Sequence, residues 1–247
     1  MNLKVLAAPK WVGFIVAGLL VAALMIRLGI WQLDRRDERQ TRAAAVLAQE
    51  RKSPVPVETI MGGLTLESAV GEQWRRVIAT GIFDAAHEVL IANRSFQTKP
   101  GYHVVTPLKL TDHDLLGVLV NRGWIPLETR VGERPSPPSP PPGVVTVTGR
   151  VRVTQTRGSL GPKDAPAGVL TVLARTDVAR ISDQTPYPLL PLYVEAETTW
   201  AGVEPIPAPD SGSGPHLAYA VQWFAFAAAG IVAWVIILRR ALRKSAS

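Results

Sequence analysis

Two long apolar runs stand near the ends of this chain, and mixed polar and apolar sequence fills the space between them. The first run extends from Trp11 to Ile26 without a charge, and its helical pattern continues to Leu33. The second run, Leu217 to Leu238, is also uncharged. Because about 20 apolar residues in a helix cross a hydrocarbon core of ~30 Å, each run is long enough to span a bilayer. The pattern predicts transmembrane helices at residues 11–33 and 216–238.

The region between the runs, residues 34–215, has the pattern of a β-sheet protein. After a charged, helix-like segment that ends near Lys52, short β-branched and apolar stretches alternate with turn-forming sequence. We expect strands at 75–83, 88–95, 102–110, 115–124, 144–153, 168–173 and 189–195. So many short strands without a long helix between them favour an antiparallel sheet or barrel. The fold class is therefore α+β, a mostly antiparallel β domain with one transmembrane helix at each end.

A proline-rich segment, Arg134 to Gly143, interrupts the β pattern. Proline donates no backbone hydrogen bond, so the segment cannot join a strand ladder and is expected at the surface as an extended loop or linker. Such a loop could divide the region into two domains. Neither half holds an obvious complete core, so we expect one domain.

Positive charge is concentrated outside the β region. The net charge is +7, and the two tails, residues 1–10 and 239–247, hold basic but no acidic residues. Residues 34–215 are balanced in charge, which argues against a nucleic-acid partner. The positive-inside rule then predicts a multi-pass protein of the cell membrane with both termini in the cytoplasm and the β domain outside. Arginines between residues 35 and 42 argue mildly the other way, but acidic residues interleave them.

The first run could instead be the apolar core of a cleaved signal peptide. Its length, the lack of a small-residue cleavage site, and the helical pattern that continues from Arg27 to Leu33 favour an uncleaved anchor.

The sequence offers little catalytic chemistry. The chain has no cysteine, which excludes c-type haem attachment, cysteine-ligated zinc, iron–sulfur clusters and thiol catalysis. His87, His103 and His113 lack the spacing of a metal pair, so we interpret them as ordinary turn or strand residues. No nucleophile elbow, phosphate loop or dinucleotide motif is found. We therefore expect a protein that is not an enzyme.

His216 is the histidine with a distinctive setting, at the start of the second apolar run. A helix would place four further residues on its face, namely Tyr219, Trp223, Phe226 and Gly230. An imidazole at the water interface above aromatic rings and a glycine would suit a flat, apolar ligand with a metal at its centre, such as haem. The same residues also fit the aromatic belt of an ordinary membrane helix. The pattern leaves both interpretations open.

Arg27 also has two interpretations. It lies within two turns of the outer end of the first run, from where its side chain could reach the lipid headgroups. It could equally pair with a haem propionate or with an acidic residue of a partner.

Three segments, taken in order, carry a resemblance to a known family. Leu28 to Arg35 closes the first run, Val118 to Pro126 ends the most apolar strand, and His216 to Phe226 opens the second run. With Gly101 to Pro107, these segments make the chain resemble the Surfeit locus protein 1 family of cytochrome c oxidase assembly factors. The resemblance extends essentially from end to end.

The resemblance implies a chaperone that binds or delivers haem a to cytochrome c oxidase subunit I, or to its assembly intermediates. It makes His216 a candidate ligand of the haem iron. The helical face below His216 and the position of Arg27 near the outer end of the first run then add Tyr219, Trp223 and Arg27 as further cofactor-binding candidates. In the motif of the central strand, we expect Gly123 at a packing or bulge position and Trp124 in the core. Arg122 would be a structural hydrogen-bond hub or a partner contact.

Three other functions stay open. The chain could be a structural accessory subunit that stabilises an oxidase or a respiratory supercomplex without binding haem. It could be an enzyme that modifies haem or a lipid, but no catalytic group supports this. A polysaccharide chain-length regulator shares the topology, but it would need long helices outside the membrane. Membrane lipid is an expected partner in each case.

Overall fold

The computed structural model describes residues 9–60, 66–112, 115–127, 136–207 and 214–244. The chain divides into two compact units. The helix pair consists of the chain up to Val46 together with the chain from Pro209 onward, and the β unit extends from Leu47 to Ala208. Each unit is described by itself.

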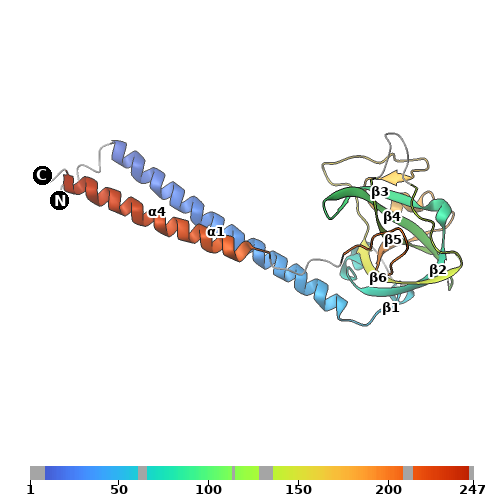
Figure 1. Ribbon diagram of the computed structural model, residues 1–247. Helices are drawn as coiled ribbons and strands as arrows, with labels where there is room; N and C mark the ends of the chain where they lie inside the picture. The colour runs from blue at the N-terminus through green and yellow to red at the C-terminus, as the bar shows by residue number, and fades with distance from the viewer. Residues whose placement is uncertain (1–8, 61–65, 113–114, 128–135, 208–213, 245–247) are drawn as a thin grey trace. The chain divides into compact units, whose positions relative to one another are not determined.

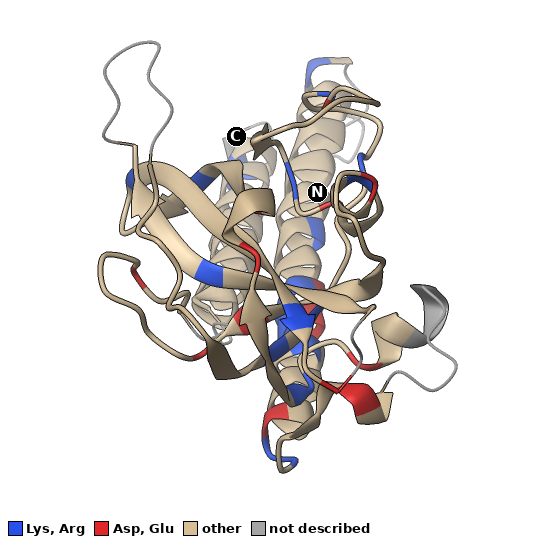
Figure 2. Ribbon diagram, turned by 90° about the vertical axis from the view of Figure 1, so that its right-hand side faces the viewer, with Lys and Arg blue, Asp and Glu red and all other residues tan. Residues whose placement is uncertain are grey.

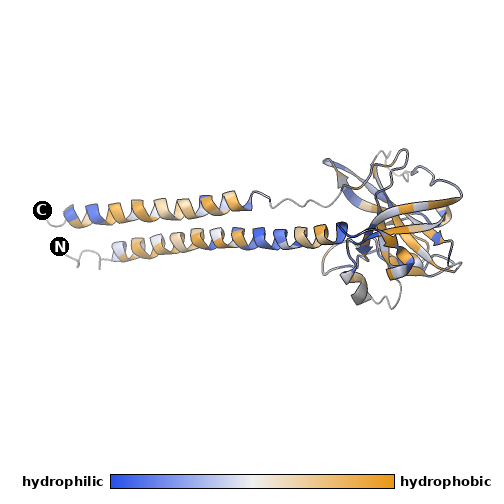
Figure 3. Cartoon of the chain, turned by 90° about the horizontal axis from the view of Figure 1, so that it is seen from below, coloured by the Kyte–Doolittle hydropathy of each residue, from blue (hydrophilic) through white to orange (hydrophobic). Residues whose placement is uncertain are grey.

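The helix pair contains the long helices α1 (Pro9–Glu50) and α4 (His216–Lys244) (Figure 1). By length and composition, each contains a stretch that could cross a membrane. Figure 3 shows α1 apolar in its first half and more hydrophilic in its second half, whereas α4 is apolar almost to its end. The predicted span at 11–33 and the charged segment after it are therefore parts of one unbroken helix.

Close contacts between small and aromatic residues hold α1 and α4 together. A Cβ atom added to Gly18 would lie 2.6 Å from Trp234 Nε1, and one added to Gly29 would lie 2.6 Å from Phe224 Cε1. Between these two points Ala227 is buried on α4. The order of these contacts makes the helices antiparallel. Small residues let helix backbones approach closely, which is the usual way for helices to associate in a membrane.

The β unit contains eight strands and four short helices among the residues that the structure describes. The strands are β1 (Val55–Pro56), β2 (Arg76–Phe83), β3 (Val89–Phe96), β4 (Lys99–Leu110), β5 (Gly117–Pro126), β6 (Val144–Val153), β7 (Val172–Leu173) and β8 (Leu189–Ala196). The helices are η2 (Val57–Ile60), α2 (Leu66–Gly71), η3 (Ala85–His87) and α3 (Val178–Ser182).

Five of the strands close into a barrel. Strand β2 pairs with β6, β6 with β8, β8 with β5, β5 with β4, and β4 again with β2. All of these pairs are antiparallel except β5 with β8, which is parallel. The sheet is therefore mostly antiparallel, as predicted, and it is closed. Closure removes the free strand edges that an open sheet would leave between these five strands.

The interior of the barrel is apolar and comes from alternate positions of its strands. Strand β2 alternates between buried and less buried residues along most of its length. Strand β5 is buried at nearly every position because both of its faces are covered. Val118 and Val120 face the barrel interior, whereas Leu119 packs in a second cluster with Ile181 of α3 and Leu173 of β7. The central place expected for this strand is thus observed.

The proline-rich segment is described from residue 136 onward and joins no strand, as expected. It is nevertheless docked rather than free. The carbonyl oxygen of Pro138 accepts a hydrogen bond of 2.9 Å from Arg122 Nη2. A Cβ atom on Gly202 would lie 2.7 Å from Pro138 Cγ, so the proline ring lies directly against that turn. Strands from both sides of the segment pair within the one barrel.

Charged residues of the β unit are mixed rather than sorted by sign. Figure 2 shows basic and acidic positions interspersed over the face that it draws. One network illustrates this: Arg150 bridges Glu50 and Glu197, and Glu197 also binds Arg76, all with N–O distances of 3.2 Å or less. Because these charges neutralise one another, this part of the barrel presents no one-sided basic surface.

Candidate functional site

A β-bulge in the central strand motif turns Arg122 out of the strand ladder. Val104 pairs with Gly123 and Val105 with Asn121, so Arg122 is the extra residue. Gly123 has a φ of 137°, and a Cβ atom there would lie 2.4 Å from the Glu204 carbonyl oxygen. Only glycine fits this close approach. The expectation of a bulge at Gly123 is confirmed, and Trp124, only 4% exposed, lies in the core as expected.

Arg122 forms a hub of interactions inside the β unit. Its side chain is 1% exposed, and Nη1 donates to Glu88 Oε2 at 2.7 Å. Thr106 Oγ1 donates to the same carboxylate oxygen at 2.6 Å. The rings of Phe83 and Trp200 lie 5.8 and 5.9 Å from the guanidinium carbon. Of the two roles expected for Arg122, the structural hub is therefore the one observed, since the buried side chain presents no surface to a partner.

His103 lies within hydrogen-bond distance of its neighbour Asn121, and burial keeps its imidazole neutral. Asn121 Oδ1 accepts a hydrogen bond from Gly123 N, so the amide group of Asn121 donates toward His103 Nδ1, 3.1 Å away. Burial, with smaller contributions from the nearby cations Arg94 and Arg152, lowers the pKa of His103 to about 4. This histidine is thus committed to the structure of the barrel.

His87 also has a structural partner. Its Nδ1 lies 2.7 Å from Asp84 Oδ2, and Tyr187 donates to the same oxygen at 2.8 Å. Burial acts to raise the pKa of Asp84, but the hydrogen bonds from Tyr187 and His87 outweigh it and lower that pKa. His113 falls outside the described residues. In the described parts of the chain, no three His, Asp or Glu side chains form a group that could hold a metal ion.

His216 has a different environment, in the helix pair. Its Nδ1 lies 2.8 Å from Gln32 Oε1 on α1. An amide oxygen only accepts, so Nδ1 donates this hydrogen bond, and whenever the imidazole is neutral Nε2 holds a free lone pair. Nε2 is buried and has no hydrogen-bond partner. Metal-binding histidines are commonly held in this way, with one nitrogen bonded to an acceptor and the other left for the metal.

Gln32 was not singled out from the sequence, and it fixes the orientation of His216. The two residues are separated by 184 positions, so no local pattern connects them. One signal was present: Gln32 is an amide within the last apolar turn of the first run, where a polar side chain needs a partner.

The other predicted site residues lie around His216 as follows. Tyr219 and Phe226 are 50% and 48% exposed, and Trp223 is partly buried, with its ring edge-to-face against Phe226 at 6.2 Å. The contact with α1 uses the adjacent face of α4, where Ala220 and Ala227 are buried. The predicted aromatic face therefore lies beside the helix–helix contact, and His216 stands at the edge of both.

Arg27 is not brought into this site. It is exposed, and no described residue forms an ion pair with it. Gly29, two positions after Arg27, packs against Phe224 of α4. At about 100° per residue, Arg27 projects from the side of α1 opposite to α4. From there it is available to lipid or to a partner protein.

Comparison with known proteins covers both units of the chain. A family model described as "SURF1 family" matches residues 19–228. A SURF1-like protein of Monosiga brevicollis is 26% identical, over 98% of this chain and 94% of the relative. An uncharacterised SURF1-like protein of Mycobacterium tuberculosis is 27% identical, over 91% and 82%. Surfeit locus protein 1 of Homo sapiens is 28% identical, over 87% and 74%.

Proposed function

Because the chain belongs to the SURF1 family, we propose that it is a non-enzymatic assembly factor for a haem–copper cytochrome c oxidase. Its role would be to bind haem a and pass it to subunit I, or to an assembly intermediate that contains subunit I. The proposal includes membrane insertion of α1 and α4, with both termini in the cytoplasm and the β unit outside.

The observation that carries the proposal is the buried, unpartnered Nε2 of His216. Haem iron commonly takes a neutral imidazole nitrogen as an axial ligand, and bound haem would supply the iron for this one. Gln32 would keep the imidazole oriented and its lone pair on Nε2. The half-exposed ring of Tyr219 and the partly buried ring of Trp223 would provide apolar surface for the porphyrin beside it.

The absorption spectrum of detergent-purified protein, from cells that make haem a, tests this proposal. We expect the parent to carry haem and His216→Ala to lose or alter its spectrum. Gln32→Leu should weaken binding without abolishing it, because the ligand stays but its orientation is lost. His87→Ala is the matched control, since its imidazole bonds to Asp84 in the β unit. An unchanged spectrum in His216→Ala would show that His216 is not the ligand.

The topology has its own test, which the absence of cysteine makes simple. Single cysteines at Ser139 and Ser245 are treated with a membrane-impermeant thiol reagent in intact cells. We expect labelling of Ser139→Cys and protection of Ser245→Cys. The reverse pattern would refute the proposed orientation.

A structural accessory subunit without haem is the second candidate. The half-exposed face of Tyr219 and Phe226 favours it, because that face would also accept a helix of another membrane protein. Purified protein that carries no haem but copurifies tightly with the oxidase would support this candidate over haem delivery.

A further inference from the structure

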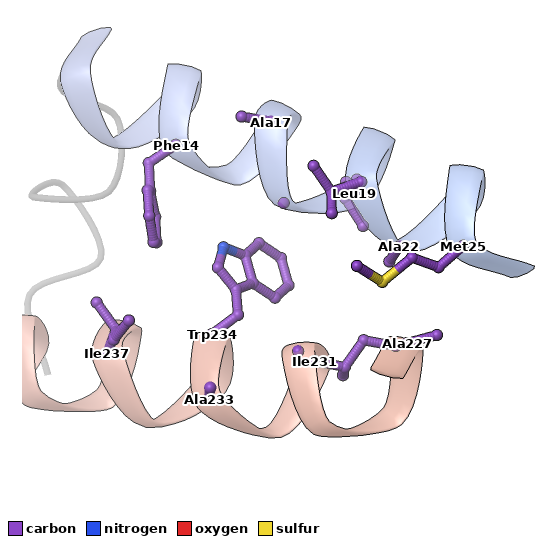
Figure 4. A pocket seen from close by; sticks show the side chains of 13 residues that line it. Phe14, Ala17, Leu19, Ala22, Met25, Ala227, Ile231, Ala233, Trp234 and Ile237 are labelled. Atoms are coloured by element: carbon purple, nitrogen blue, oxygen red, sulfur yellow. The ribbon is translucent and has the colours of Figure 1, made fainter. Parts of the chain in front are cut away.

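A second site in the helix pair lies far from His216, near the start of α1 and the end of α4. A cavity of about 450 Å³ opens there between the two helices. Figure 4 shows Phe14 of α1 facing Ile237 of α4, with the Trp234 indole projecting between the helices. Small residues, among them Ala17 and Ala233, make the remaining space.

Trp234 gives this groove an unmet polar requirement. Its Nε1 is buried and has no hydrogen-bond partner, and the other side chains that line the groove are apolar. An N–H group without an acceptor is unfavourable in hydrocarbon, where no water can accept the hydrogen bond. Nε1 lies against Gly18 of α1, so an oxygen acceptor from outside this chain can reach it once the two helices part slightly at this contact.

The end of the groove nearest the chain termini is positively charged. Lys10 lies one helical turn before Phe14 on α1, and Arg240 lies three positions after Ile237 on α4, so each continues a lining face. The antiparallel packing of the helices brings these two ends together. No described residue forms a salt bridge with either cation, and no acidic residue precedes Trp11 or follows Leu238.

We propose that this groove binds an anionic phospholipid. One acyl chain fills the apolar cavity, an ester carbonyl accepts the hydrogen bond of Trp234 Nε1, and the phosphate headgroup pairs with Lys10 and Arg240. Basic pockets between membrane helices bind anionic headgroups in this manner. A lipid supplies the acceptor and the negative charge in one molecule, which an apolar partner helix does not. The proposal rests on the membrane insertion included in the proposed function.

Fluorescence quenching by brominated lipids tests the proposal on the full chain in phosphatidylcholine vesicles. A small fraction of the lipid carries bromine on its acyl chain, with either a phosphatidylglycerol or a phosphatidylcholine headgroup. The difference between parent and Trp234→Phe isolates the Trp234 signal. We expect several-fold more quenching by the anionic lipid. Equal quenching by both lipids would reduce the groove to ordinary lipid contact and overturn the proposal.

Two pairs of variants separate headgroup binding from chain binding. Arg240→Gln should lower the quenching by brominated phosphatidylglycerol toward the phosphatidylcholine level, whereas Arg239→Gln, on another side of α4, should not. Ala233→Leu fills the groove and should reduce the Trp234 signal with either lipid, whereas Ala229→Leu lies outside the lining. Absence of Trp234 quenching in the parent would mean that a protein helix covers the groove, which also overturns the proposal.

A further measurement, in vesicles with a high fraction of brominated phosphatidylcholine, separates failure of the lipid-binding proposal from failure of the proposed function. If the helices are inserted, Trp11 and Trp223 are quenched whatever occupies the groove. Loss of all quenching would contradict membrane insertion and both proposals. Loss of the anionic preference alone would leave the haem proposal untouched, since its readout is the His216-dependent spectrum.

Discussion

The β unit and the helix pair bury polar side chains with different results. In the β unit, Arg122 forms an ion pair with Glu88, and its Nη2 atom donates a hydrogen bond to the carbonyl oxygen of Pro138. Its Nε atom has no partner. In the helix pair, the indole nitrogen of Trp234 has no hydrogen-bond partner. Of the two ring nitrogens of His216, Nδ1 bonds to Gln32 and Nε2 has no partner. The barrel interior is filled by side chains, whereas the helices keep an open groove.

This difference agrees with the proposals above, which assign stability to the barrel and binding to the helix pair. The barrel binds the charge of Arg122 and the Nδ1 atom of His103 from within, so both residues serve the fold although each lies in a segment that carries the family resemblance. Single buried atoms of Gln49, Arg75, Arg94 and Arg122 nevertheless have no partner there. In the helix pair the unpartnered atoms are Nε2 of His216 and Nε1 of Trp234, the two residues on which the binding proposals rest. A buried polar group is thus better judged by what it still lacks than by its chemical type.

The largest change in unfolding free energy should come from replacement of Arg122. Arg122→Ala leaves Glu88 as a buried, uncompensated charge and should cost about 3–5 kcal/mol of unfolding free energy. Denaturant unfolding of the detergent-solubilised chain, followed by tryptophan fluorescence, measures this. Adding Glu88→Gln to Arg122→Ala should recover part of the loss, because the stranded charge is removed. A cost below 1 kcal/mol would mean that the barrel does not depend on this hub.

Two glycines with positive φ test whether the contact at the β-bulge contributes to the stability of the barrel. Gly123→Ala combines a positive φ with a clash against the Glu204 carbonyl and should cost about 3 kcal/mol. Gly143 also has a positive φ, of 78°, but no atom lies within 4 Å of the added Cβ. Gly143→Ala should therefore cost only about 1 kcal/mol. Similar losses in the same unfolding assay would exclude the bulge contact as the cause.

The pH dependence of unfolding should reveal His103. Its pKa is lowered to about 4, so between the ordinary value near 6.5 and 4 the unfolded chain binds a proton that the folded chain does not. The stabilising contribution is complete above pH 6.5 and is lost as the pH falls to about 4. After allowance for partial exposure, it amounts to about 2 kcal/mol.

Replacement by a residue that does not titrate isolates this contribution. His103→Gln keeps an acceptor for Asn121 and should unfold with a shallower pH dependence over that range. If parent and variant have parallel pH profiles, His103 is not held neutral in the folded state.

A substitution in the helix pair should have the smallest effect on the unfolding free energy of the barrel. Gly29→Leu drives a side chain into Phe224 and should separate the helices locally. We expect the unfolding free energy of the β unit to change by less than about 0.5 kcal/mol, while the His216-dependent haem spectrum is lost. A large loss of barrel stability would break the distinction between the two regions.

The strands were predictable because their signals are local. Alternation and turn residues placed a strand at 144–153, which are the bounds of β6. The strand expected at 168–173 is reduced to Val172–Leu173, because Gly168 has a positive φ and its carbonyl accepts from Arg180 rather than from a strand. No local sequence pattern indicates that the barrel closes, because closure depends on pairings between distant segments.

The helix-pair site was predicted only in part, for a similar reason. His216 stood out because its place at the start of an apolar run is visible in sequence. The choice of the α4 face that meets α1 was not visible, since Ala220 and Ala227 are less conspicuous than the aromatic residues beside them. Packing by small residues depends on what the partner helix offers, here Gly29 and Gly18.

The position of β8 sets an order of events during protein synthesis. It is the last of the described strands, yet it lies between β6 and β5 in the ring and supplies Leu190, Leu192 and Val194 to the interior. Until the ribosome has made residue 196, β5 and β6 each lack a neighbour and the barrel stays open to solvent. Barrel closure therefore waits for β8, which only α4 follows among the described elements. A premature stop codon before Leu189 would release an open, apolar sheet rather than a shorter version of the same protein.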